Sequence, residues 1–209
     1  MKGAVSRVFE DFFKKNAEPL LKKGFRVLDF GCGDGKYYEF YTRLTPAENV
    51  FGAEISEKRV ARCHKMGWKN VVKIEGLARI PWPDSFFDLI NFDQVIEHMP
   101  ERDILFYFKE FDRVLSDNGI IIVTTPNYPI KRVYDFLNAF RLNDLKRLKD
   151  DPTHITKYNF KKLKNIASQH FNVLSLEPTG GLFWSKLKHN SLSHKIVGIL
   201  QKRCKQDSM

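Results

Sequence analysis

This chain of 209 residues lacks several features that would assign it to a class directly. Its three cysteines, Cys32, Cys63 and Cys204, are odd in number and show no metal-type spacing, so they imply neither a disulfide framework nor a zinc site. No apolar run approaches the length needed to span a membrane. The N-terminus is interrupted by charge and lacks a signal-peptide core. We therefore expect a cytoplasmic protein with no integral membrane segment and no metal.

The composition is that of a folded protein, with 43% hydrophobic and 29% charged residues. The length predicts a single domain over 1–209 that buries a full sheet-and-helix core. A net charge of +10 is compatible with RNA, an anionic substrate, anionic lipid or simply a lysine-rich surface. The charge by itself selects none of these partners.

The most informative stretch is 27–36, VLDFGCGDGK, which reads as an apolar strand, a glycine turn and the start of a helix. This order forms one half of a nucleotide-binding crevice. Its glycines follow the spacing G-x-G-x-G, and the bulky Lys36 stands where a nicotinamide fingerprint needs a small residue. Asp29 lies two residues before the first glycine, where a strand-end carboxylate would meet a cationic ligand.

A second strand is expected over 49–54 and ends in Glu54. A carboxylate at the tip of the strand next to the glycine turn can accept hydrogen bonds from both hydroxyls of a ribose. The alternative is a solvated carboxylate at the end of a strand. Ser56 is predicted to cap the next helix, which runs to about Met66.

Strand and helix patterns alternate through most of the chain, which predicts an α/β fold. We expect a Rossmann-like, three-layer, doubly wound sheet that is mostly parallel and has an antiparallel last strand. The expected elements are helices over 36–44, 102–115 and 160–170, a turn over 117–119, and strands over 71–75, 86–92, 120–124, 171–177 and 182–187.

Four motifs in order resemble those of the class I S-adenosylmethionine-dependent methyltransferases, and in particular the small-molecule, UbiE/UbiG-like type. They are VLDFGCGDG at 27–35, PWPDSFFD at 81–88, DQVIEH at 93–98 and FDRVL…TTPN within 111–127. The resemblance implies S-adenosyl-L-methionine as cofactor, S-adenosyl-L-homocysteine as product, and methyl transfer by in-line displacement to an O, N or C nucleophile.

The resemblance also implies which residues hold the cofactor. Asp29 serves its amino acid end, and the glycine turn lets it cross the backbone. The family's adenine-binding Asp falls at Gly76, so either Glu75 replaces it or backbone groups of Leu77 and Ala78 hold the base. The full set of expected cofactor residues is Asp29, Gly31, Cys32, Gly33, Gly35, Glu54, Ile55, Glu75, Gly76, Leu77, Ala78, Asp93 and Gln94.

Two histidines are candidate catalytic residues. His98 follows the fourth strand, where the family places substrate next to the methyl group, and His154 lies in a DPTHI stretch that resembles a family segment at the pocket mouth. Imidazole titrates near neutral pH and suits a general acid or base. For His98, a hydrogen bond that merely stabilises a loop is an equally good explanation.

The acceptor is expected to be a small molecule, with anionic and lipid-like compounds among the candidates. The (N/D)PP(Y/F) motif of base-amine methyltransferases is missing, because the chain reads NFDQ at 91–94. Three alternatives stay open: an RNA methyltransferase, a non-catalytic S-adenosylmethionine-binding protein, and a nicotinamide-dependent oxidoreductase. The sequence indicates neither the oligomeric state nor the atom that is methylated.

Three segments flank or interrupt the alternating pattern. Residues 1–24 predict a helical leader whose phenylalanines pack on the core. Residues 128–152 mix aromatic and basic side chains and predict a lid insertion over the active site. Residues 191–209 predict a basic C-terminal tail with one apolar face, which we expect to be a helix packed on the body.

Overall fold

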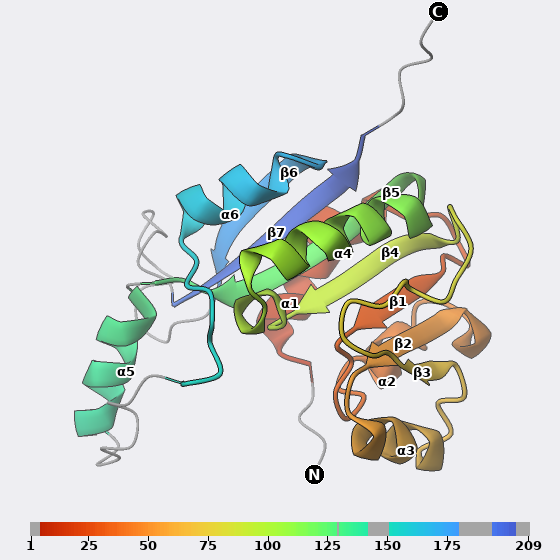
Figure 1. The fold of residues 1–209 in the computed structure, drawn as a ribbon, viewed down its shortest axis with the longest axis horizontal. Helices are drawn as coiled ribbons and strands as arrows, with labels where there is room; N and C mark the ends of the chain where they lie inside the picture. The colour runs from red at the N-terminus through yellow and green to blue at the C-terminus, as the bar shows by residue number, and fades with distance from the viewer. Residues whose placement is uncertain (1–4, 129, 142–150, 180–193, 204–209) are drawn as a thin grey trace, which may run out of the picture.

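A computed structural model describes residues 5–128, 130–141, 151–179 and 194–203. Its centre is a seven-stranded sheet in the order β3-β2-β1-β4-β5-β7-β6 (Figure 1). The first five strands in this order pair in parallel, and β7 runs antiparallel to both of its neighbours. The strands are β1 (Val27–Phe30), β2 (Val50–Glu54), β3 (Val71–Lys73), β4 (Phe87–Asp93), β5 (Leu115–Pro126), β6 (Phe171–Thr179) and β7 (Lys195–Lys202). The predicted α/β fold with an antiparallel last strand is confirmed.

Helices cover both faces of this sheet, so the fold has three layers. Figure 1 shows α4 and α6 in front of the sheet and α1 behind it. The helices are α1 (Arg7–Phe12), α2 (Tyr38–Tyr41), α3 (Glu57–Lys65), α4 (Glu101–Val114), α5 (Ile130–Arg141) and α6 (Phe160–Ala167), with shorter turns η1 (Phe13–Ala17), η2 (Glu18–Leu20), η3 (Ala47–Asn49) and η4 (Ile96–His98). None of these helices is long and apolar enough to cross a bilayer.

The central strands are apolar throughout because both of their faces are buried. Successive side chains of a strand point to opposite faces. In β1, Leu28 and Phe30 join the core beneath α4 and α6, whereas Val27 joins the core beneath α1, α2 and α3. The strand places Asp29, 2% exposed, on the second face, at its carboxyl end.

The N-terminal segment packs through its aromatic side chains, as predicted. Phe9 and Phe13 of α1 and η1 contact Phe40, with ring centroids 5.8 and 5.2 Å away, and Phe9 also contacts Tyr37 at 4.9 Å. Ser6 accepts a hydrogen bond from the Phe9 backbone N–H and so caps α1. The leader is thereby fixed against the segment that follows the glycine turn.

Three local expectations differ from the structure. The helix expected over 36–44 is only the four-residue α2, because turns take up the rest of that segment. The turn expected over 117–119 lies within β5, whose first residue, Leu115, pairs with Phe87. Ser56 stands at the N-cap of α3, but its side chain makes no capping bond. By contrast, Asn159 caps α6 as predicted, accepting from the Lys162 N–H at 2.9 Å.

The C-terminal prediction was wrong. The strand expected over 182–187 falls outside the described residues, and the antiparallel strand is instead β7, within the expected tail helix. Ile196, Val197, Ile199 and Leu200 are buried on the two faces of the sheet. Their spacing fits one face of a helix as well as a strand buried on both sides, so apolar periodicity could not separate the two.

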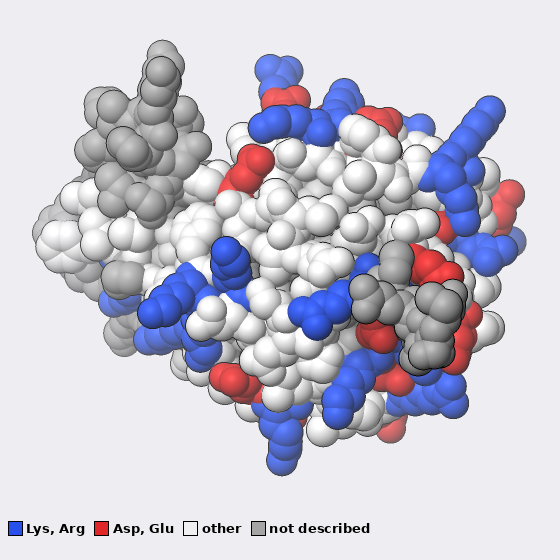
Figure 2. All heavy atoms as spheres, turned by 90° about the horizontal axis from the view of Figure 1, so that it is seen from above, with Lys and Arg blue, Asp and Glu red and all other residues white. Residues whose placement is uncertain are grey.

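The excess of basic residues is dispersed on the face shown in Figure 2. Lys and Arg lie at its edge and across its lower half with Asp and Glu among them, and a largely uncharged area occupies its upper middle. Within the described residues, this face offers no continuous basic track of the kind that follows a phosphate backbone.

Candidate cofactor and active site

The glycine turn after β1 is held by the neighbouring strand. The backbone N–H groups of Gly31 and Cys32 both donate to the Ala53 carbonyl, at 2.8 and 3.1 Å. Gly31 has φ of +76°, and a Cβ built there would lie 2.5 Å from Val95 Cγ2. Position 31 therefore requires glycine for two reasons, the left-handed backbone and the close approach of the β4 loop.

Glu54 lies at the end of β2, only 3% exposed, and both of its oxygens are already in hydrogen bonds. Oε2 accepts from the Gly33 N–H and Oε1 from the Ser56 N–H, each at 2.9 Å. The carboxylate thus joins the glycine turn to the residue at the start of α3. Since an ionised carboxylate has about four acceptor sites, it retains the capacity to bind ribose hydroxyls.

Asp29 is buried with one oxygen unsatisfied. Its Oδ1 accepts from Asn91 Nδ2 at 2.7 Å, whereas Oδ2 is buried without a hydrogen-bond partner. Burial raises the pKa of Asp29 to about 7, with the Asn91 bond opposing and the charges of Asp93 and Glu54 reinforcing the rise. A buried carboxylate oxygen without a partner is costly, so this atom fits a cationic or hydrogen-bond-donating ligand group.

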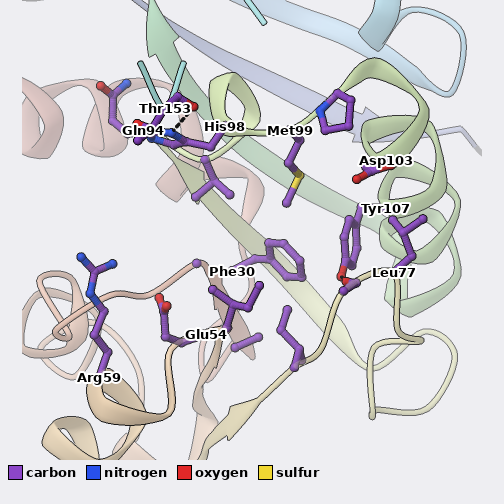
Figure 3. Close-up of a pocket in the computed structure, with 17 residues that line it drawn as sticks. Phe30, Glu54, Arg59, Leu77, Gln94, His98, Met99, Asp103, Tyr107 and Thr153 are labelled. Atoms are coloured by element: carbon purple, nitrogen blue, oxygen red, sulfur yellow. Dashed lines mark hydrogen bonds between the residues drawn. The ribbon is translucent and has the colours of Figure 1, made fainter. Parts of the chain in front are cut away.

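A cavity of about 530 Å³ opens beside these residues at the carboxyl ends of β1, β2 and β4 (Figure 3). Such a position is where doubly wound sheets bind their ligands. The expected site residues that line it are Gly31, Glu54, Ile55, Gly76, Leu77, Gln94 and His98. The others, which do not line it, are Asp29, Cys32, Gly33, Gly35, Glu75, Ala78, Asp93 and His154.

The cavity also contains residues that the sequence did not suggest, above all Asp103 and Tyr107 of α4, together with Arg59 of α3 and Thr153. Figure 3 shows Asp103, Tyr107 and Leu77 together on one side and Glu54 on the other. A usable signal was present, because Asp103 and Tyr107 are four residues apart and share one face of a helix. That face also carries core residues, which concealed the signal.

Asp93 faces a second, smaller cavity of about 230 Å³ between α1, α2 and β7. Its carboxylate is 3.2 Å from Lys36 Nζ and accepts a hydrogen bond from the Thr124 hydroxyl. Gln94, which follows it, has φ of +57° and turns the chain out of β4 towards the larger cavity. Asp93 and Gln94 thus line different cavities.

The two predicted catalytic histidines lie together. Their ring centroids are 4.9 Å apart, and the potential ligand atoms of Glu97, His98 and His154 all lie within 4.8 Å of one another. His98 Nδ1 is 3.0 Å from the Thr153 carbonyl, and His154 Nδ1 is 2.9 Å from the Tyr128 hydroxyl. A segment 55 residues further along the chain thus orients His98.

Glu97 is the third member of this cluster, and it is only 1% exposed. Burial raises its pKa to about 7, although the Thr125 hydroxyl donates to Oε2 at 3.1 Å and lowers it. Two imidazoles and a carboxylate can exchange protons near neutral pH. They are also a ligand set that divalent transition metals accept, which the cysteine spacing alone did not suggest.

Comparison with known proteins shows which family this chain resembles. Residues 28–123 match the family described as "Methyltransferase domain". The chain is 27% identical over 183 residues to a ubiquinone biosynthesis O-methyltransferase of Pelagibacter ubique, covering 80% of this chain and 73% of that protein. It is 33% identical over 132 residues to a protein of the same name from Sinorhizobium fredii, covering 60% of this chain and 50% of that protein.

Solved structures show the same fold. A methyltransferase from Archaeoglobus fulgidus, described as S-adenosylmethionine-dependent, superposes with a TM-score of 0.67 at 21% identity, covering 94% of this chain and 95% of that one. The matched segment, the relatives and the shared fold together indicate a class I S-adenosylmethionine-dependent methyltransferase. It is an enzyme that uses S-adenosylmethionine as methyl donor.

The residues present fit this cofactor. Asp29 Oδ2 lacks a partner that a cationic amino acid group can supply, and the nearby acids Glu54 and Asp93 favour a sulfonium over a neutral ligand. Apolar Ile55 and Leu77, 67% and 42% exposed, stand in the cavity as walls for a base. When bound, the cofactor supplies a methyl group already activated by its positive sulfur.

Proposed function

We propose that this methyltransferase methylates a hydroxyl oxygen of a small molecule, with His98 as general base and His154 and Glu97 as its partners. The observation that carries the proposal is the approach of Glu97, His98 and His154 to within 4.8 Å at the edge of the cofactor cavity. A hydroxyl is a weak nucleophile until its proton is removed, whereas a neutral amine needs no base. The names of the two relatives, both O-methyltransferases, support the same choice of atom.

The hydrogen bonds of His98 favour the tautomer that a base requires. Its Nδ1 faces the Thr153 carbonyl, which can only accept, so Nδ1 carries the proton. Its Nε2 then keeps a free lone pair. His98 is also exposed while Glu97 is buried, which places the base on the acceptor's side and the carboxylate behind it.

The remaining task of the protein is alignment of the two reactants. Effective molarities of about 10⁵–10⁸ M show that orientation can lower a barrier by roughly 7–11 kcal/mol. Here the turn at Gly31 would fix the donor on one side of His98. Gln94, whose φ is +57°, would help to hold it there. The segment that contains His154 would hold the acceptor on the other side.

We also propose that residues 128–152 form a lid over the acceptor. The segment starts directly at the active site, because Asn127 forms a bridge with Tyr158 and the Tyr128 hydroxyl contacts His154. Helix α5 follows at once, with Val133 and Leu137 more than half exposed. Exposed apolar side chains on a helix that begins two residues after Tyr128 support an acceptor that is partly apolar. Residues 142–150 lie outside the described part of the chain.

The test uses His98→Ala and a matched control, His170→Ala, whose imidazole lies near Phe108 and outside both cavities. Methyl transfer from labelled S-adenosylmethionine is measured against a panel of phenols, aliphatic alcohols, carboxylic acids, amines and RNA. We expect turnover of a hydroxyl acceptor to fall about 10²–10⁴-fold in His98→Ala, with product binding by calorimetry unchanged.

Two results would contradict the proposal. Turnover by His98→Ala at the wild-type rate would exclude the base, and turnover of RNA or amines alone would exclude the hydroxyl acceptor. Dialysis against a chelator distinguishes a general base from a metal site in this cluster. A general base is unaffected by it, whereas a metal-dependent site loses activity and regains it when a divalent cation is added.

A further inference from the structure

The loop after β3 lacks the carboxylate that would hold the adenine amine. Gly76 stands at that position, with φ of +47° and nothing within 4 Å of a Cβ built on it. Gly76 lines the cavity, so the space that an acidic side chain would fill there is empty of protein. The base of the cofactor must therefore be recognised by another group.

The structure speaks against Glu75 and against the Ala78 backbone as substitutes. The Glu75 side chain is 78% exposed, pairs with Lys73 at 2.8 Å and does not line the cavity. The backbone of Ala78 hydrogen-bonds to the Tyr107 hydroxyl, which in turn donates to the Gly76 carbonyl. Tyr107 thus occupies the Gly76 carbonyl and the Ala78 backbone, so of the two backbone candidates Leu77 alone stays open to a base.

The same contacts bring α4 against the loop and show which of its faces is turned there. Tyr107 points to Gly76, and Asp103 lies one turn earlier on the same face. Burial raises the pKa of Tyr107, and the negative charge of Asp103 raises it further, as expected for neighbours. Both side chains line the cavity with Leu77 (Figure 3).

Asp103 retains the capacity to accept further hydrogen bonds. Its side chain is 23% exposed, and Oδ1 accepts from Arg102 Nε at 3.1 Å. Asp103 and Glu54 are the two acidic side chains that line the large cavity, and they lie on opposite sides of it in Figure 3. Two acceptor groups at the ends of an apolar slot match a nucleoside, which has ribose hydroxyls at one end and an amine at the other.

We propose that Asp103 accepts a hydrogen bond from the exocyclic 6-amino group of adenine and so selects the nucleobase of the cofactor. Glu54 then holds the ribose, and α4 supplies the acid that the loop after β3 lacks. A carboxylate accepts from an exocyclic base amine in the same way when proteins read cytosine. The inference rests on S-adenosylmethionine as cofactor and leaves the acceptor undefined.

Calorimetric titration tests this with two ligands that differ only at the base: S-adenosylhomocysteine and S-inosylhomocysteine, in which a carbonyl oxygen replaces the amine. We expect the wild type to prefer the adenosyl ligand, because a carboxylate repels a carbonyl oxygen. In Asp103→Ala, affinity for the adenosyl ligand should fall about 10-fold or more, and affinity for the inosyl ligand should stay or rise. In Asp103→Asn the preference should reverse or vanish, since an amide can donate.

The matched controls are Glu101→Ala and Glu75→Ala. Glu101 shares the first turn of α4 with Asp103, so its removal changes the charge at the helix start equally without touching the cavity. Both controls should bind both ligands as the wild type does.

Three results would overturn the inference. They are an unchanged preference in Asp103→Ala, an equal loss for both ligands, and a change of preference in Glu75→Ala. A wild type that binds neither ligand would overturn the cofactor assignment as well, and is thereby distinguishable from a failure of Asp103 alone.

Discussion

Two buried carboxylates at the ends of adjacent strands, Glu54 and Asp29, are satisfied in different ways. Glu54 accepts from two backbone N–H groups, those of Gly33 and Ser56, so the protein alone completes it. Asp29 has one hydrogen bond, from Asn91, and one buried oxygen without a partner. The first acid organises the turn without a ligand, whereas the second keeps a buried acceptor that we expect the ligand to fill.

The largest expected effect is that of Glu54→Ala. The variant lacks the carboxylate that we expect to bind the ribose and loses the tie between the glycine turn and α3. Because hydrogen bonds to charged groups contribute about 1.5–3 kcal/mol each, affinity for S-adenosylhomocysteine should fall about 100-fold or more by calorimetry. Glu48→Ala, an exposed acid before β2, is the control and should bind normally. Undiminished binding by Glu54→Ala would show that this carboxylate has no ligand role.

Asp29→Asn should weaken ligand binding less than Glu54→Ala does. It should raise the free energy of unfolding rather than lower it. The amide oxygen can still accept from Asn91, so the fold is kept, but the charge that faces the cationic ligand is lost. We expect about 10-fold weaker binding and, at pH 8, an increase of about 1–3 kcal/mol in the free energy of unfolding. Chemical denaturation with and without ligand measures both. A variant less stable than the wild type at pH 8 would contradict the assigned burial cost.

The stability of the ligand-free wild type should depend on pH through the same group. The pKa of Asp29 is about 7 in the folded chain against an ordinary 3.8, so the folded state holds a proton that the unfolded state releases. Stability from this group is therefore full below pH 4 and is lost as pH rises from about 4 to 7. At about 1.4 kcal/mol per pH unit, the loss is bounded by about 4 kcal/mol. The free energies of unfolding of the wild type and Asp29→Asn should therefore be similar at low pH. They should diverge as the pH rises.

The smallest effect should come from Ser56→Ala. Its hydroxyl makes no cap bond, and Glu54 already accepts from its backbone N–H, so the free energy of unfolding should change by less than about 0.5 kcal/mol. Asn159→Ala, which removes a real side-chain cap from α6, should cost about 1 kcal/mol in the same denaturation experiment. Equal losses in the two variants would show that the Ser56 hydroxyl stabilises α3 after all.

Local patterns predicted the parts of the molecule that local chemistry determines. The glycine turn, the strand end at Glu54 and the Asn159 cap follow from a few neighbouring residues, and the structure has all three. The helical pattern of residues 191–209 failed because a strand buried on both faces can have the same apolar spacing as a helix.

Contacts between distant segments determine the features that the sequence did not predict. The use of Glu54 as a backbone clamp depends on Ser56 and Gly33 meeting in space. The entry of Asp103 into the cavity depends on how α4 packs against the loop at Gly76, which no pattern within α4 specifies. Sequence reasoning therefore placed the glycine turn and the carboxylate at the end of β2 correctly, whereas their contacts with the cofactor stay predictions.

The central claim, that Asp29 is completed by the cofactor's cationic end, is tested most directly by proton release on binding. S-adenosylhomocysteine is titrated at pH 7 in buffers of different ionisation enthalpy, with wild type and Asp29→Asn. With a pKa of about 7, Asp29 is partly protonated before binding and must lose that proton to face the ligand's ammonium. The account predicts release of roughly half a proton by the wild type and markedly less by the variant. Equal release by the two proteins, or none by the wild type, would contradict it.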